Sequence, residues 1–377
     1  MSNMIKLGDV ATYINGYAFK PEDRGEEGLP IIRIQDLTGN AYDLGFYNGE
    51  YPEKIEINDG DVLISWSASL GVYVWNRGKA LLNQHIFKVM FDKAEIDKNY
   101  FVYAVRQKLD EMGRKTHGAT MKHIVKKDFD ATQIPYPSLE EQSEIATNLD
   151  KVSNVIENRK QELQLLDTLI KARFVEMFGN ENNSKNWHIV NVEKVADVQV
   201  GVVIKPSQYY TDESNGVRAF RSLNVGAGFI KDTAWVYFTE EGHHKNSKSI
   251  LKENDLLIVR SGAPGTACVV TKEYAGYNAI DIIIVHPDCE RVNPYYLCTF
   301  TNMPHGKKQI DEGTGGAAQQ HFNVGKYSKL KLMLPPKKLQ DDFANFIDQV
   351  DKSKVAVQKA LDETQMLFDS LMQKYFM

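Results

Sequence analysis

The chain has 377 residues, of which 42% are hydrophobic and 25% are charged, and its net charge is −5. This composition is typical of a globular protein, and the length exceeds what one hydrophobic core normally serves, so we expect two or more domains. The sequence has no apolar run of about eighteen residues and no apolar secretory stretch near its start, which excludes a membrane-spanning helix and favours a cytoplasmic protein.

Taken from its N-terminus, the chain reads as an internal repeat. In each copy, apolar runs after Asp-containing turns predict buried strands, a Tyr-rich segment predicts a short helix and a Gly-Ala segment predicts a loop. A Pro-containing segment then leads into a long heptad pattern. The corresponding segments are 5–11 and 190–196, 32–37 and 220–225, 59–64 and 253–258, 99–103 and 294–297, 118–124 and 316–322, and 134–137 and 334–336.

Residues 138–178 predict one long helix. Steps of four and three residues place apolar side chains at eight of ten positions, which is the period of a coiled-coil seam. Ser138 and Glu141 form a capping box at its start, and Gly179 supplies the left-handed residue that ends a helix. The seam positions are Ile145, Leu149, Val152, Ile156, Arg159, Leu163, Leu166, Ile170, Arg173 and Met177.

Residues 336–377 repeat this pattern, again with eight of ten seam positions apolar. A helix of forty residues is about 60 Å long, and neither helix can bury its stripe alone, so we expect the two to pair. The second globular part joins the end of one helix to the start of the other, which makes the pair antiparallel. The seam positions are Phe343, Ile347, Val350, Lys354, Val357, Leu361, Thr364, Phe368, Leu371 and Tyr375.

The predicted fold class is therefore α+β, with two pseudo-symmetric globular domains joined by two long helices that pair as an antiparallel coiled coil. The predicted domains are residues 1–137 and 179–335, and the predicted helices are residues 138–178 and 336–377. An approximate two-fold axis would cross the middle of the helices. Two similar but non-identical surfaces would then be held at a fixed separation.

This pattern resembles the specificity subunit of a type I restriction-modification system. The resemblance rests on the doubled globular part, on Gly-Ala-Thr-Met-Lys-His-Ile at 118–124 and on Ile-Pro-Tyr-Pro-Ser-Leu-Glu-Glu-Gln at 134–142. The second repeat departs from the pattern at 317–321 and 335–340, where the acidic pair and the capping Ser are missing, and single residues transfer less directly there.

The resemblance implies two target recognition domains, each of which reads one part of a split, asymmetric site in double-stranded DNA. The helices would set the spacing and dock two adenine-methylating modification subunits, and restriction subunits would complete the nuclease. We expect half-sites about one helical turn of 10–10.5 base pairs apart. The two helices carry −4 of the net charge of −5, so the globular parts are nearly neutral and can hold basic patches.

DNA grooves are read by Arg, Lys, Asn, Gln and Ser side chains on loops, with further cations and amides on phosphates. The strongest patch is 114–118, where bases lie on a Gly-containing loop, although a solvated surface loop is an equal alternative. Arg33 and Arg221 could instead be structural ion-pair partners. The candidates are Lys20, Arg24, Arg33, Gln35, Ser65, Ser67, Asn83, Gln84, His85, Arg114, Lys115, Thr116, His117, Lys122 and His123, and in the second domain Lys205, Arg218, Arg221, Asn224, Arg260, Ser261, Asn278, Lys307, Lys308, Gln309, Gln319, Gln320 and His321.

We expect no catalytic residues, no metal and no cofactor. The segment 293–296, Asn-Pro-Tyr-Tyr, is similar to an adenine methyltransferase motif, but an Asn cap followed by Pro at the first helical position explains it. The segment 313–316 lacks the Lys and Ser/Thr of a phosphate loop. The odd number of cysteines, Cys268, Cys289 and Cys298, argues against disulfides. Neither His243 with His244 nor the set of Cys289, Cys298 and His305 has the spacing of a zinc site.

Two alternatives stay open. One is a coiled-coil scaffold that binds only proteins, and the other is a split methyltransferase or nuclease with its own active site.

Overall fold

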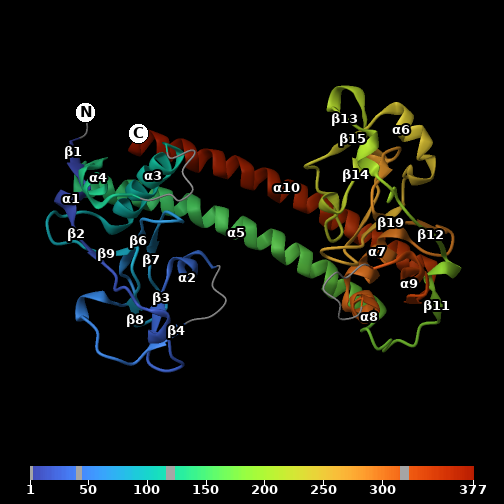
Figure 1. Ribbon diagram of the computed structural model, residues 1–377, viewed down its shortest axis with the longest axis horizontal. Helices are drawn as coiled ribbons and strands as arrows, with labels where there is room; N and C mark the ends of the chain where they lie inside the picture. The colour runs from blue at the N-terminus through green and yellow to red at the C-terminus, as the bar shows by residue number, and fades with distance from the viewer. Residues whose placement is uncertain (1–2, 40–44, 116–123, 315–321) are drawn as a thin grey trace. The chain divides into compact units, whose positions relative to one another are not determined.

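The computed structural model describes residues 3–39, 45–115, 124–314 and 322–377 (Figure 1). The chain forms two compact units, one of Met1–Lys160 with Lys359–Met377 and one of Gln161–Gln358. Each unit combines a globular part with one half of each of two long helices, α5 (Leu139–Phe178) and α10 (Lys337–Phe376). The predicted α+β class with two repeated domains and paired helices is confirmed. The division between the compact units falls within the two long helices, because each half-helix packs on a globular part.

Unit 1 is built on two four-stranded sheets. The first sheet is antiparallel throughout, whereas the second contains one parallel pair, β3 with β8. A further antiparallel pair, β1 with β10, closes the globular part. In sheet order the strands are β2 (Thr12–Asn15), β9 (Ile86–Met90), β6 (Val62–Ser65) and β7 (Gly71–Val74); β4 (Gly45–Tyr47), β3 (Leu29–Ile32), β8 (Ala80–Leu82) and β5 (Glu56–Ile57); and β1 (Met4–Lys6) with β10 (Gln133–Pro135).

Unit 2 repeats the first sheet, the parallel pair and the closing pair, but its second sheet has its fourth strand at the other edge, where β13 pairs with β15 instead of a strand pairing outside β18. The parallel pair is now β14 with β18, and the closing pair is β11 with β20. In sheet order the strands are β12 (Ala196–Val200), β19 (Ile282–Pro287), β16 (Leu256–Val259) and β17 (Ala267–Val269); β13 (Tyr210–Thr211), β15 (Val236–Phe238), β14 (Val217–Phe220) and β18 (Asn278–Ala279); and β11 (Ile189–Asn191) with β20 (Lys331–Met333).

Two helical segments correspond between the units: α4 matches α9, and α3 matches the pair α7 and α8, a difference that Pro304 explains. The long α3 of unit 1 is replaced in unit 2 by α7 and α8, because a proline cannot continue a helix and a new helix begins there. Unit 1 contains α1 (Leu7–Val10), α2 (Ile34–Thr38), α3 (Lys98–Lys115) and α4 (Lys126–Ala131), and unit 2 contains α6 (Glu240–Lys245), α7 (Pro294–Asn302), α8 (Pro304–Thr314) and α9 (Val324–Ser328).

The predicted seams of α5 and α10 are buried or half-buried at all ten positions of each helix. In unit 1, Leu149 near the start of α5 shares a core with Phe376 at the end of α10. In unit 2, the end of α5 meets the start of α10, where the centroids of the Phe174 and Phe343 rings lie 5.5 Å apart. The two helices are therefore antiparallel partners within each unit. Among the described residues, no helix is long and apolar enough to cross a bilayer.

Each long helix is fixed to its globular part by a glutamine that is fully buried. Gln142 donates to the carbonyl of Pro137 at 2.9 Å and accepts the N–H of Asp97, in front of α3, at 2.9 Å. Gln340 does the same in unit 2, with Pro335 and with the Asn293 N–H, each at 2.8 Å. A buried amide that satisfies a backbone N–H and a backbone carbonyl from separate segments locks those segments together.

The anchor can be tested with Gln340→Ala. We expect the free energy of unfolding of unit 2 to fall by about 1–3 kcal/mol, because the Asn293 N–H is left buried without a partner. The measurement is urea unfolding followed by circular dichroism. Gln349→Ala, at an exposed position of the same helix, is the control and should change the stability by no more than about 0.5 kcal/mol. Equal losses in both variants would show that Gln340 is no anchor.

Candidate nucleic-acid interface

A polar hollow of about 400 Å³ opens in unit 1 beside α2. It lies between α2, the loop that follows β6 and the segment that joins β8 to β9. Six of the predicted DNA-contacting residues line it, although they come from three separate stretches of sequence. These are Arg24, Arg33, Gln35, Asn83, Gln84 and His85.

The segment 83–85 is held in a fixed bend by backbone hydrogen bonds. The N–H of Asn83 donates to Ile32 at 3.1 Å and that of Gln84 donates to Tyr17 at 2.8 Å. His85 follows with a φ of 72°, in the left-handed region that residues other than Gly, Asn and Asp seldom adopt. Strain of this kind persists where the surrounding structure imposes it, and it is frequent at binding sites. The bend leaves the Gln84 side chain exposed at the hollow.

Arg33 supports the hollow from inside. Its side chain is only 8% exposed, and its Nε lies 3.1 Å from Oδ2 of Asp36. The same oxygen accepts the backbone N–H of Arg33 at 2.8 Å and so caps α2. Arg33 thus forms a structural ion pair, which was the alternative interpretation of this residue. Arg24 and Gln35, which also line the hollow, are exposed.

Trp66 does not line the hollow but contacts His85, which does, and it was not selected from the sequence. Its ring stacks on Phe87 at 5.5 Å and meets the His85 ring edge-on at 4.9 Å. Its indole N–H donates to Asn15 at 3.3 Å. The only signal in the sequence is its place in the Ser-Trp-Ser stretch directly after a buried strand.

In unit 2 the corresponding place holds an ion pair. The guanidinium of Arg260 binds Asp281 and donates from Nε to the Phe322 carbonyl at 3.2 Å. Asp281, like His85, has a positive φ, here 49°. Asp281 was also missed from the sequence, where an acidic residue gives no sign of a DNA contact.

The other basic candidates of unit 2 are spread over its surface. Lys205 is exposed, whereas Arg218 lies between Glu213 and Asp232, 3.9 and 3.6 Å away. Arg221 donates to the carbonyl of Ala234 at 2.5 Å. Ser261 is half-buried directly after Arg260.

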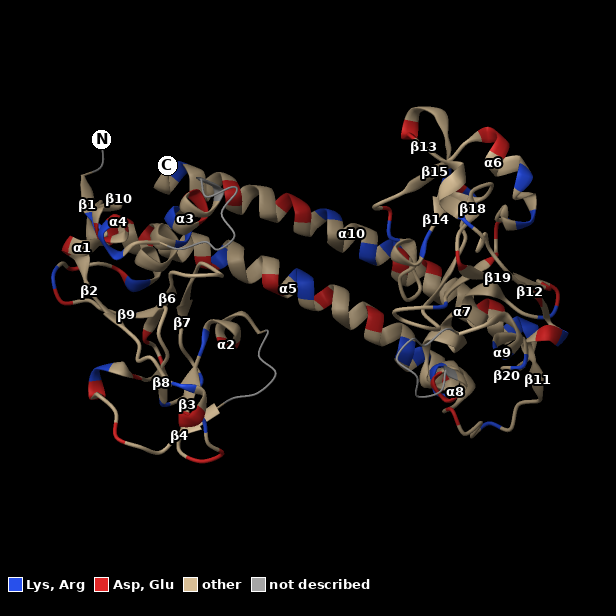
Figure 2. Ribbon diagram, in the orientation of Figure 1, with Lys and Arg blue, Asp and Glu red and all other residues tan. Residues whose placement is uncertain are grey.

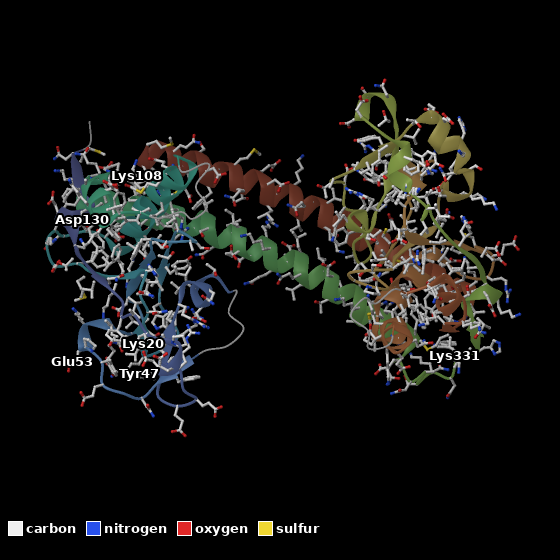
Figure 3. All side chains as sticks on the ribbon, viewed as in Figure 1. Lys20, Tyr47, Glu53, Lys108, Asp130 and Lys331 are labelled. Carbon is white, nitrogen blue, oxygen red and sulfur yellow. The ribbon has the colours of Figure 1, made fainter. Side chains whose placement is uncertain are left out.

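In unit 1, Lys20 lies on the surface within 4.0 Å of Glu22 (Figure 3).

Besides Arg33, four predicted contact residues are buried inside the fold. Asn278 is fully buried and donates to Ser249 Oγ at 2.8 Å. Asn224 caps the turn that follows β14 by accepting the Arg221 N–H at 2.8 Å. Ser65 Oγ donates to the Ser69 carbonyl at 2.5 Å, and Ser67 is 5% exposed. Buried polar groups need such partners, and these side chains therefore serve the fold rather than a ligand.

Other predicted residues lie outside the described part of the chain. They are Arg114, Lys115, Thr116, His117, Lys122, His123, Gln319, Gln320 and His321. For Arg114 and Lys115, only the helical backbone is described.

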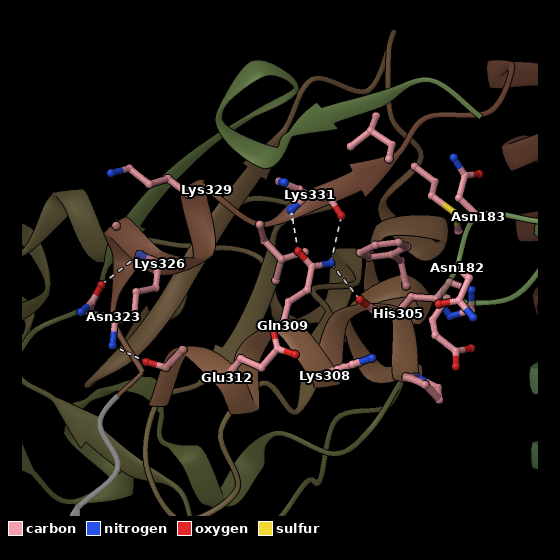
Figure 4. A pocket seen from close by; sticks show the side chains of 18 residues that line it. Asn182, Asn183, His305, Lys308, Gln309, Glu312, Asn323, Lys326, Lys329 and Lys331 are labelled. Atoms are coloured by element: carbon pink, nitrogen blue, oxygen red, sulfur yellow. Dashed lines mark hydrogen bonds between the residues drawn. The ribbon is translucent and has the colours of Figure 1, made fainter. Parts of the chain in front are cut away.

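A second pocket of about 890 Å³ lies in unit 2 between α8, α9 and β20 (Figure 4). Lys308 lines it together with three exposed lysines that the sequence did not single out, Lys326, Lys329 and Lys331. Gln309 connects the elements, since it accepts the Lys331 N–H at 2.9 Å and donates to the Lys331 carbonyl at 3.0 Å. The lysine side chains suit phosphate groups.

The neighbours of this pocket are less available to a ligand. Lys307 points elsewhere and donates to the Pro264 carbonyl at 2.8 Å, and burial lowers the pKa of its ammonium group. His305 is buried, and its Nε2 lies 3.1 Å from the Gly179 carbonyl. Burial lowers its pKa, so the imidazole is neutral at pH 7 and adds no charge to the lysines.

The residues that resembled chemical motifs have structural roles. Asn293 caps α7 by accepting the Tyr295 N–H at 2.9 Å, and Pro294 occupies the first turn, as predicted. Burial raises the pKa of the Cys298 thiol to about 12, and Cys268 is also buried, whereas Cys289 is exposed. In the described part of the chain, no group of His, Cys, Asp and Glu is placed to hold a metal ion.

Comparison with known proteins gives a consistent result. The family model described as "Type I restriction modification DNA specificity domain" matches residues 2–167 and 184–364. The type I restriction enzyme EcoBI specificity subunit of Escherichia coli is 22% identical over 99% of this chain and 85% of its own length.

Two solved structures share the fold. The S subunit of a type I restriction-modification system from M. genitalium superposes with a TM-score of 0.54 at 15% identity, over 100% of this chain and 96% of that one. A chain from a structure on complex assembly and conformational transition of the type I R-M system gives a TM-score of 0.61 at 16% identity, over 99% and 97% of the two chains.

Gln84→Ala tests the hollow. The side chain is exposed, so stability should change by no more than about 0.5 kcal/mol, whereas DNA binding should weaken by about 1–3 kcal/mol if the amide contacts a base edge. Binding is measured by fluorescence anisotropy with a duplex that the protein selects. Gln133→Ala, which removes an exposed amide from β10 of the same unit, should bind like the unchanged protein. Equal affinity of all three proteins would remove Gln84 from the interface.

Proposed function

Because the chain belongs to the family of type I restriction-modification DNA specificity proteins, we propose that it reads a split, asymmetric DNA site with one half-site for each unit. It acts as the non-catalytic specificity subunit of a complex that methylates and cleaves DNA. Since such a complex works on cellular and incoming DNA, its place is the cytoplasm.

The observation that carries this proposal is one backbone pattern with two sets of side chains. Both units have a short connection at the same place, in front of β9 and β19, but unit 1 lines it with amides and unit 2, where it is one residue shorter, with an ion pair. Polar side chains on loops at the end of a sheet are suited to hydrogen bonds with base edges. Two different readers on one repeated scaffold favour an asymmetric target.

The distribution of charge also supports DNA as the ligand. Acidic and basic residues both occur along α5 and α10 (Figure 2). The hollow of unit 1 is lined by two arginines and three amide side chains, with no Asp or Glu among the described residues that line it. The pocket of unit 2 is lined by four lysines and four amide side chains together with two glutamates. Phosphate contacts at such positions supply affinity and register, and base contacts add the sequence preference.

The long helices offer a surface for protein partners. An open apolar groove of about 410 Å³ runs along α5 in unit 2, lined by Leu165, Leu166, Leu169 and Ala172. Leu165 is 67% exposed and Leu169 is 46% exposed, which is unusual for leucines on a monomer surface. We assign this face of the helices to the modification subunits, two of which would join the complex, followed by restriction subunits.

DNA selection tests the reading function. The full chain, purified with its modification subunits, is incubated with randomised duplexes, and the bound sequences are determined. We expect two short conserved blocks separated by a spacer of constant length. A single contiguous block would contradict the two-reader proposal, and the absence of any enriched sequence would favour a protein-binding scaffold. Methyl transfer by this chain alone would favour a split enzyme.

Leu165→Glu combined with Leu169→Glu tests the docking face. Because both leucines are exposed, the variant should fold normally but lose the modification subunits in co-purification. Gln161→Glu combined with Gln164→Glu is the control, since it adds the same charge at exposed positions of the same helix. Retention of the modification subunits by the leucine variant would place their docking site elsewhere.

A further inference from the structure

The two units place different side chains at one point of a shared hydrogen-bond pattern. β6 pairs with β9 in unit 1, and β16 pairs with β19 in unit 2. In unit 1, the carbonyl of Trp66, directly after β6, accepts the N–H of Ile124. In unit 2, the carbonyl of Arg260, directly after β16, accepts the N–H of Phe322. The corresponding residues are Ser65 and Val259, Trp66 and Arg260, Ile86 and Ile282, and Ile124 and Phe322.

The connection in front of these strands is one residue shorter in unit 2. Residues 83–85 join β8 to β9, but only residues 280–281 join β18 to β19. Asp281 therefore takes the place of both Gln84 and His85. Its N–H donates to Val202 at 3.1 Å, as that of Gln84 does to the equivalent carbonyl, and its positive φ matches that of His85.

The ion pair at this point is oriented. The side chain of Arg260 is 16% exposed, whereas that of Asp281 is 44% exposed, so the guanidinium lies inside and the carboxylate faces out. Arg260 is held by its bond to the Phe322 carbonyl and contacts Oδ1 of Asp281. Among the described residues, Oδ2 has no hydrogen-bond partner. An outward acceptor is thus available to a ligand.

A carboxylate at a DNA surface is normally repelled by phosphates, but this one is neutralised by the guanidinium beneath it. An ionised carboxylate only accepts hydrogen bonds. In the major groove, the donors on base edges are the exocyclic amino groups of cytosine N4 and adenine N6.

From this geometry, and resting on the proposed DNA-reading function, we propose that Asp281 is the specificity-determining residue of unit 2. It accepts a hydrogen bond from the amino group of a cytosine or adenine in that half-site. Arg260 is a positioning residue, which orients the carboxylate and cancels its charge. In unit 1, the amide of Gln84 both donates and accepts at the same place, so the two half-sites are selected by different chemistry.

The test is DNA selection by the full chain with its modification subunits, carried out for the unchanged protein and for Asp281→Asn. We expect the unchanged protein to select two blocks. In Asp281→Asn, one base-pair position of one block should lose about 5- to 100-fold of its preference, while the other block stays the same. Asp197→Asn makes the same charge change at an exposed position near the far end of the same sheet, and it should alter neither block.

Arg260→Met separates positioning from mere structural support. With the carboxylate no longer neutralised, binding to all duplexes should weaken, and more strongly at low salt, where repulsion is screened less. Adding Asp281→Asn to Arg260→Met should restore general binding without restoring the base preference. A purely structural pair would give no such rescue, and that result would overturn the role of Arg260.

Asp281→Gly keeps the proposal testable if Asp281→Asn folds poorly. Glycine adopts a positive φ without strain, so the turn is kept although the ion pair with Arg260 is lost, and this variant should show the same relaxed position. An unchanged motif in both variants would overturn the proposal while leaving the reading function intact. Absence of any motif with the unchanged protein would instead contradict the proposed function itself.

Discussion

The buried glutamine at the first turn of each long helix is the contact on which the arrangement of each unit depends. Gln142 accepts the N–H of the residue in front of α3 and donates to a carbonyl in front of α5. Gln340 does the same with the residue in front of α7 and a carbonyl in front of α10. Hydrophobic contacts alone would allow the helix to slide or rotate, because they have little directional preference. The two directed hydrogen bonds remove that freedom, so the loops of each globular part keep a fixed direction relative to their own half of the helix pair.

What repeats between the units is therefore backbone rather than side chains. The strand order of the first sheet, the parallel pair and the closing pair of strands recur, and so do the buried anchors. The exposed ends of the connections differ in composition and by one residue in length. A scaffold whose core and anchors recur in both units can carry different loops without refolding.

The sequence was sufficient for the large features because they rest on periodic patterns. The heptad stripe predicted every seam position of both helices, and Asn-Pro predicted the start of α7. The residues that contact DNA were harder to predict, because the polarity of a side chain does not show whether it faces solvent or fills a polar site in the core. Asn224 and Asn278 were selected for their amides but are buried, Asn224 as the cap of a local turn and Asn278 by its bond to Ser249 on a distant segment. Trp66 and Asp281 were passed over because their place is defined only by the strands around them.

The short connection between β18 and β19 also bears on how such proteins can change over time. Its flanking strands are paired in the same register as those of unit 1, so gain or loss of one residue there is absorbed within the turn and leaves the sheet undisturbed. Insertions and deletions at this turn, and not only substitutions, are thus open to natural variation. Lineages could diversify their targets by altering turn length while the folding core stays under unchanged selection.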